Sequence, residues 1–134
     1  MAERAARTET QSAETSATVA AVIGVLANPM HIPRWAPDFA DRVTGDATSG
    51  WRANKGDREF PLRAVVDREA GTADYLRQVA ADREGGAYIR AFPRPGGGSV
   101  VVMTLPLLPE VDPAATRMTL SRELTALRSL VEDV

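Results

Sequence analysis

One arrangement with the potential to bind a ligand or take part in catalysis is an arginine that alternates with two aromatic residues. Over residues 86–94, Tyr88, Arg90 and Phe92 alternate along one face of a predicted strand. If that face points inward, Arg90 is a buried cation that needs a carboxylate or an anionic ligand. If it points outward, the guanidinium stacks across the rings in solvent. The alternation alone leaves both orientations open.

A second pair of polar side chains lies on the predicted strand 72–81. Tyr75 and Arg77 share one face, and Leu76 and Gln78 share the other. A one-residue shift of the hairpin register exchanges these faces, so the sequence does not decide which is inward. In a dry pocket, Tyr75, Tyr88 or Arg90 would polarise a carbonyl group and move a proton.

Several familiar kinds of site are excluded or weakened by composition. The chain has no cysteine, which excludes disulfides and thiolate ligands, and His31 is its only histidine. His31 lies between two prolines, and we interpret it as a surface or packing residue, with an acid or base at a pocket rim as the alternative. The glycines at 96–98 precede a strand, which predicts a hairpin turn and not a phosphate loop. We expect no metal and no cofactor.

Large apolar side chains on faces expected to be buried complete the candidate pocket. Trp35 is interpreted as packing the helix pair against the sheet, with a pocket wall or lid as the alternative. In the segment 58–68, Phe60 and Leu62 share the face expected to point inward. The candidate ligand-binding residues are Trp35, Trp51, Phe60, Leu62, Tyr75, Tyr88, Arg90, Met103, Leu120 and Leu124.

Helical patterns occur near both ends of the chain. The stripe of Val19, Val22, Ile23 and Leu26 predicts a helix over 17–27, with Thr15 or Ser16 as its N-cap, followed by a short helical turn in the proline-rich segment 29–39. From Asp112 and Pro113 a long amphipathic helix is predicted to residue 134. An edge strand is expected at 7–14, and further strands at 40–45, 50–55, 58–68, 72–81, 86–94 and 99–108.

These elements predict an α+β fold. Short connections favour an antiparallel meander, and the long C-terminal helix is the element able to cover its apolar face. We expect a curved antiparallel sheet wrapped around that helix, with two short helices after the first strand. The 134 residues match one domain, 1–134, in which residues 1–7 are expected to fray.

Charge and hydropathy limit the partners. The 16 Lys and Arg against 18 Asp and Glu give a net charge of -2 without a basic cluster, which argues against nucleic-acid binding. The apolar run 18–27 is too short to span a bilayer and follows an acidic lead, so we expect neither membrane insertion nor export. A cytoplasmic location fits the lack of cysteine. Oligomeric state is not encoded in any recognisable pattern.

In this order, several segments resemble the SRPBCC superfamily, the helix-grip group of START domains and polyketide cyclase-like proteins. They are ATVAAVIGVLANP, HIPRWAPDFADRV, VVDREAGTADY, YIRAFPRPGGGSVVVMTL and SRELTALRSLVED. The chain looks most similar to small bacterial single-domain members. The segment RANKGDRE departs from the glycine-rich loop of the plant members.

The resemblance implies a cavity between the sheet and the last helix that binds a hydrophobic or aromatic molecule. The resemblance does not imply a particular set of catalytic residues or a metal site in this sequence. Binding of such a ligand is therefore the first hypothesis, and whether the protein is an enzyme stays open. The alternatives are a polyketide-type aromatase or cyclase that works by metal-free acid–base chemistry, and a structural or partner-binding domain whose cavity is filled by its own side chains.

Overall fold

The computed structural model describes residues 7–81, 83–107 and 110–132. The elements run in the order β1 (Thr8–Thr15), α1 (Val19–Leu26), the 3-10 helix η1 (Pro29–His31), α2 (Ile32–Trp35), β2 (Arg42–Asp46), β3 (Gly50–Lys55), β4 (Arg58–Asp67), β5 (Thr72–Ala80), β6 (Arg83–Pro93), β7 (Ser99–Pro106) and α3 (Pro113–Glu132). The expected fraying at 1–6 and the expected strand and helix ends at 108 and 133–134 lie outside the described residues.

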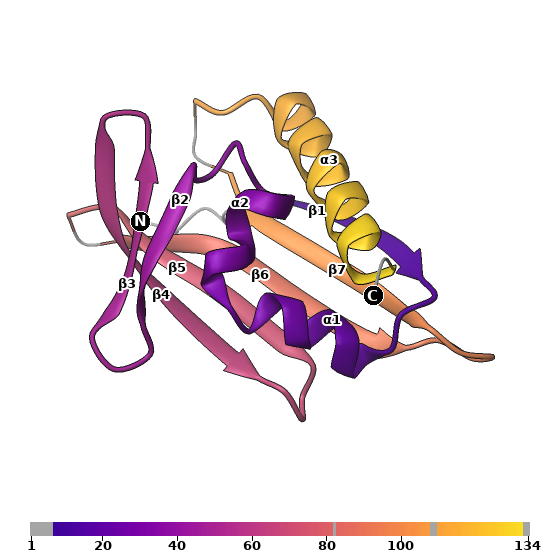
Figure 1. Ribbon diagram of the computed structural model, residues 1–134. Helices are drawn as coiled ribbons and strands as arrows, with labels where there is room; N and C mark the ends of the chain where they lie inside the picture. The colour runs from indigo at the N-terminus through magenta and orange to yellow at the C-terminus, as the bar shows by residue number, and fades with distance from the viewer. Residues whose placement is uncertain (1–6, 82, 108–109, 133–134) are drawn as a thin grey trace, which may run out of the picture.

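The strands form one antiparallel sheet that the helices cover on one face (Figure 1). Its order is β1-β7-β6-β5-β4-β3-β2, so consecutive strands β2 to β7 are neighbours and β1 closes the edge beside β7. The long helix α3 lies across β1 and β7, while α1 and α2 lie beside it over the middle of the sheet (Figure 1). This is the predicted helix-grip α+β fold.

The inward face of each strand follows the alternation read from the sequence. Leu62 of β4 and Tyr75 of β5 are buried under the helices, as are Ile89 of β6 and Met103 of β7. The face of β6 that carries Arg90 therefore points away from the helices. The core lies between this inner face and the apolar stripe of α3, which includes Leu120, Leu124, Leu127 and Val131.

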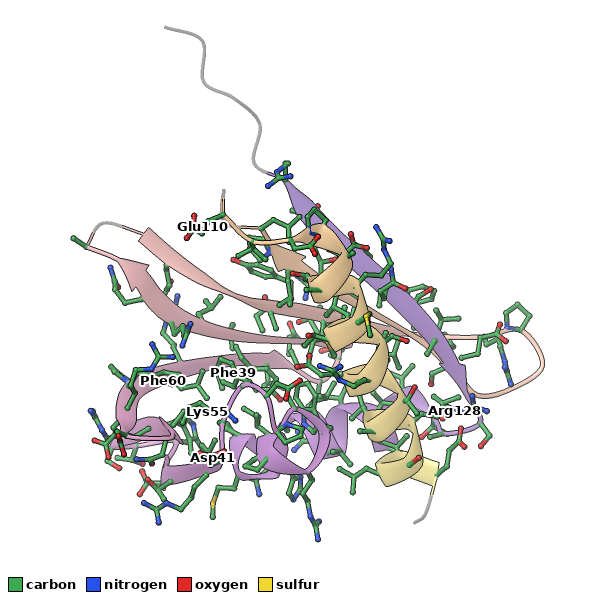
Figure 2. All side chains as sticks on the ribbon, turned by 90° about the horizontal axis from the view of Figure 1, so that it is seen from above. Phe39, Asp41, Lys55, Phe60, Glu110 and Arg128 are labelled. Carbon is green, nitrogen blue, oxygen red and sulfur yellow. The ribbon has the colours of Figure 1, made fainter. Side chains whose placement is uncertain are left out.

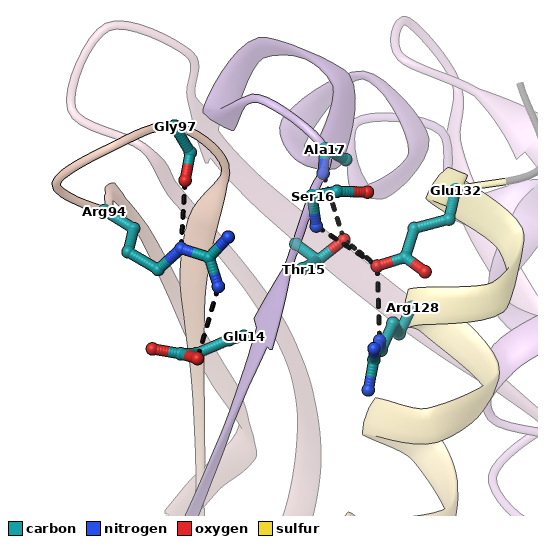
Figure 3. A network of polar contacts seen from close by, with 8 residues as sticks. All are labelled: Glu14, Thr15, Ser16, Ala17, Arg94, Gly97, Arg128 and Glu132. Carbon is teal, nitrogen blue, oxygen red and sulfur yellow. Dashed lines mark hydrogen bonds and ion pairs between the residues drawn. The ribbon is translucent and has the colours of Figure 1, made fainter.

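The start of α1 differs from the prediction. Its N-cap is Thr18, whose Oγ1 accepts a hydrogen bond from the Ala21 amide at 3.1 Å. The Thr15 hydroxyl and the Ser16 amide instead donate to the Glu132 carboxylate at the end of α3 (Figure 3). This contact joins residues far apart in the sequence, so no local pattern predicts it. At the start of α3, the Asp112 carboxylate accepts a hydrogen bond from the Ala114 amide at 3.0 Å, as expected for an N-cap.

Strand β6 begins three residues earlier than predicted, at Arg83. The sequence predicts a start at 86 because two adjacent glycines indicate a turn, but Gly85 and Gly86 pair with Arg77 and Leu76 of β5 inside the strand. Glycine often marks a turn, but in β6 these glycines lie inside the strand, where the lack of a side chain leaves space above the sheet. Among the described residues, no helix has the combined length and hydropathy that crossing a bilayer requires.

Candidate functional site

A cavity of about 310 Å³ lies between the sheet and the helices. It is bounded by α2 and the loop after it, by β5 and the start of β6, by the end of β7, and by the first half of α3. Its walls are mostly apolar, with a few polar side chains. The residues that line it are Ile32, Trp35, Ala36, Asp38, Phe39, Tyr75, Arg77, Gly85, Gly86, Ala87, Leu105, Pro106, Val111, Thr116, Thr119 and Glu123.

Small residues of β6 form the sheet side of this cavity. Gly85 and Ala87 continue the inward face of Ile89 and Ala91, but they carry little or no side chain. Gly86 is required for a separate reason, because a Cβ atom there would overlap the carbonyl oxygen of Tyr75. The start of β6 therefore leaves space for the cavity, whereas the next part of the strand fills the core with its side chains.

Trp35 supplies a polar atom without a partner. Its side chain is 2% exposed at the end of α2, and its ring lies 5.8 Å from that of Tyr75, tilted by 40°. The buried indole Nε1–H finds no acceptor among the described residues. An unsatisfied buried donor costs about 1–3 kcal/mol of stability.

Tyr75, by contrast, is already engaged. Its hydroxyl donates a hydrogen bond to the carbonyl oxygen of Leu26 at the end of α1. Burial raises the pKa of the Tyr75 hydroxyl above its usual value. The residue thus serves as a neutral wall that connects α1 to the sheet, and its proton is committed to Leu26.

Glu123 is a buried carboxyl group in the wall formed by α3. It is 8% exposed, and no hydrogen bond or ion pair joins it to another residue in the described ranges. Burial, helped by the nearby charge of Asp38 and opposed by that of Arg122, raises the pKa of Glu123 to about 7. Near neutral pH this carboxyl can both give and accept a proton.

An ion pair crosses the rim beside Glu123. Arg122 of α3 donates to the Asp38 carboxylate at 2.6 Å, and its other contact is with Thr119 Oγ1 at 3.4 Å. Both charged side chains are well exposed. The pair connects the loop after α2 to α3 and compensates the Asp38 charge.

Arg77 is the cation of the cavity. Its guanidinium carbon lies 4.8 Å from the ring centre of Phe60 and 5.7 Å from that of Phe39. The two rings meet edge to face at 5.5 Å, and Figure 2 labels both residues next to one another. Burial and the charge of Arg58 lower the pKa of Arg77. Stacking on the rings therefore holds the guanidinium in place without neutralising its charge.

The structure distributes the candidate residues over three regions. Trp35 and Tyr75 line the cavity. Leu62, Met103, Leu120 and Leu124 are buried in the core, and Trp51 and Phe60 pack against its edge. Tyr88 and Arg90 lie on the outer face of β6, where Arg90 pairs with Asp74 at 2.6 Å.

The cavity also contains residues that the sequence prediction did not include. Asp38, Arg77 and Glu123 are the charged members of this group, and for Arg77 and Glu123 the sequence contained a signal. Glu123 follows Leu120 by three residues and precedes Leu127 by four, which places a carboxyl on the apolar face of the helix. Arg77 shares its strand face with Tyr75.

His31 lies in η1 and does not line the cavity, although the next residue, Ile32, does. Its Nδ1 is 3.0 Å from the carbonyl oxygen of Val25, which makes it a packing contact between η1 and α1. No group of three or more metal-ligating side chains is found within the ranges that the structure describes.

An antiparallel sheet that grips a long helix, with a cavity between them, defines the helix-grip class, and solved structures share this fold. A START superfamily protein from Mycobacterium smegmatis superposes with a TM-score of 0.72 at 14% identity, over 94% of this chain and 97% of its own. The Zhui aromatase/cyclase from a Streptomyces strain gives a TM-score of 0.64 at 15% identity, over 96% and 94%.

The likeness extends to a two-domain protein. The di-domain ARO/CYC BexL matches with a TM-score of 0.68 at 18% identity, over 94% of this chain and 46% of that one. No family model and no curated protein matches the sequence. The chain has the helix-grip fold of the SRPBCC type, as the sequence resemblance implied.

Proposed function

We propose that the protein binds a small, largely apolar or aromatic molecule in the cavity between α2, α3 and the sheet. The observation that carries the proposal is the indole N–H of Trp35, buried without a partner in an apolar wall. The cavity volume of about 310 Å³ lies at the lower end of the range of small-molecule sites. Its apolar walls and few polar groups match the composition of such sites.

The polar and aromatic groups of the cavity support a particular ligand chemistry. Trp35 can donate to a carbonyl, ether or phenolic oxygen, and Glu123 in its protonated form can donate as well. The rings of Trp35 and Phe39 offer flat apolar contact to an aromatic body. A compact aromatic compound with one oxygen acceptor fits this set.

The binding proposal is tested with a variant that fills the cavity. Phenylnaphthylamine, a neutral fluorescent probe, should bind to the wild type with one probe per chain. Ala87→Leu should abolish this binding, because the added side chain enters the cavity from the sheet. Ala64→Leu, a matched change at a residue on the inward face of β4 that does not itself line the cavity, is the control. Equal binding to wild type and a folded Ala87→Leu would contradict the proposal.

A second candidate function is proton transfer on a bound carbonyl compound. The observation that favours it is Glu123, a carboxyl with a pKa of about 7 in the same cavity as the free Trp35 donor. The Glu123 carboxylate would remove a proton from the carbon next to the carbonyl group. The electron pair would move to the carbonyl oxygen, which Trp35 Nε1–H would stabilise. Such a step is of the kind that an aromatase or cyclase requires.

Deuterium exchange tests this second function directly. In heavy water, the wild type should accelerate exchange of the methyl protons of acetylnaphthalene, as followed by proton NMR. Glu123→Gln should remove the acceleration while leaving phenylnaphthylamine binding intact. Exchange at the buffer rate in the wild type would contradict catalysis and leave a binding protein.

A further inference from the structure

The cavity contains one charge that the protein itself does not compensate. Asp38 is paired with Arg122, and Glu123 carries a proton below its pKa of about 7. Arg77 forms no ion pair with an acidic residue in the described part of the chain, and neither does its neighbour Arg58. Positive charge therefore accumulates at this end of the cavity.

The surroundings of Arg77 leave its polar edge available. Phe39 and Phe60 lie against the guanidinium, at ring distances of 5.7 and 4.8 Å. Opposite Arg77 on β6 stands Gly85, which has no side chain to occupy the adjoining space. A planar guanidinium that is held by stacking and faces an open cavity is suited to bidentate recognition of a carboxylate.

We propose that the ligand of this cavity carries a carboxylate that binds Arg77, on an aromatic or apolar body that occupies the rest of the space. This inference rests on the proposed binding function and specifies its ligand class. The carboxylate would supply the counter-charge that Arg77 lacks, while the Trp35 and Glu123 end of the site receives the neutral part of the molecule.

Competition between two matched compounds tests the inference. Naphthylacetate and naphthylacetamide differ in charge but hardly in shape, and each is used to displace phenylnaphthylamine from the protein. The wild type should prefer the carboxylate by about tenfold or more, the factor expected for a hydrogen-bonded charge. Arg77→Gln should lose that preference, measured as the ratio of the two displacement constants within the variant. Arg58→Gln, the control for long-range charge, should keep most of it.

The outcomes separate this inference from the function on which it rests. If the wild type binds phenylnaphthylamine but both competitors displace it equally well, the carboxylate assignment is overturned and binding stands. The same holds if Arg77→Gln retains the preference. If the wild type fails to bind phenylnaphthylamine, the binding function is contradicted, and the inference fails with it. The wild-type comparison needs no variant, so a poorly folding Arg77→Gln does not protect the inference.

Discussion

Trp35 and Tyr75 share a wall of the cavity, with ring centres 5.8 Å apart, but their polar atoms differ in state. The Tyr75 hydroxyl donates to Leu26, whereas the Trp35 indole N–H has no acceptor among the described residues. One polar atom therefore joins two elements of the fold, and the other is left without a partner in the protein.

Tyr75→Phe should lower the free energy of unfolding by about 1–2 kcal/mol, because it removes the hydrogen bond to Leu26 in a buried site. Affinity for phenylnaphthylamine should change little. Urea denaturation measures the first effect. Tyr88→Phe makes the same chemical change on the outer face and should fall within about 0.5 kcal/mol of the wild type. Equal effects of the two variants would contradict the assigned role of Tyr75.

Trp35→Phe should reduce binding selectively for ligands that contain an acceptor. Acetylnaphthalene can accept from the indole N–H, and ethylnaphthalene of nearly the same shape cannot. The wild type should prefer the acetyl compound by roughly threefold to tenfold, the range of about 0.5–1.5 kcal/mol for one hydrogen bond. Calorimetric titration should show that Trp35→Phe removes this preference. A preference that survives the substitution would show that another group reads the oxygen.

Glu123→Gln should change how stability depends on pH. Because folding raises the pKa of Glu123 from its ordinary value of 4.5 to about 7, the folded state holds the proton more tightly than the unfolded state does. The associated stability is fully present below pH 4.5 and is lost as the pH rises through 7. Between pH 5 and 8 the wild type should lose roughly 2–3 kcal/mol relative to the variant.

Urea unfolding of both proteins at several pH values measures this difference. Carboxylates with lowered pKa values, such as Asp41, Glu59 and Glu84, act in the opposite sense and below their ordinary pKa. The difference in free energy of unfolding between the wild type and Glu123→Gln cancels their contribution, because both proteins contain them. A difference that stays constant from pH 5 to 8 would contradict a buried, titrating Glu123.

Thr15→Val should destabilise the junction between β1 and α3. The Thr15 hydroxyl donates to Glu132 at 2.7 Å and accepts from the Ala17 amide at 3.1 Å, while Arg128 binds the same carboxylate at 3.2 Å (Figure 3). Because Thr15 is buried, losing both bonds should cost about 1–3 kcal/mol in urea denaturation. Thr125→Val on the exposed side of α3 is the control. If Thr15→Val loses no more stability than this control, the role of Thr15 is contradicted.

The fold was predictable from local signals. Alternating apolar residues identified the inward faces of β4 and β7, and turn residues at Gly71 and 96–98 separated the strands. The period of α3 and its Asp112 cap identified the long helix. Strand β6 was predicted to begin too late, because glycine often marks a turn and the pairing of Gly85 and Gly86 with β5 is a tertiary feature.

The cavity was predictable only in part. Its presence depends on small residues at Gly85 and Ala87, and the absence of a side chain gives no pattern in a single sequence. Arg90 stood out because it lies between two aromatic residues, yet its face points outward and Asp74 binds it. The cation that lines the cavity is Arg77, whose orientation depended on a register that the sequence left open.

The central claim is that a ligand occupies the cavity beside Trp35, and the indole N–H signals of the two tryptophans test it most directly. In a nitrogen–proton correlation spectrum, titration with acetylnaphthalene should shift the Trp35 indole signal strongly and the amides of Gly85, Gly86 and Ala87 with it. The Trp51 indole, outside the cavity lining, should stay in place. A stationary Trp35 signal, or shifts confined to the outer face around Tyr88 and Phe92, would contradict the claim.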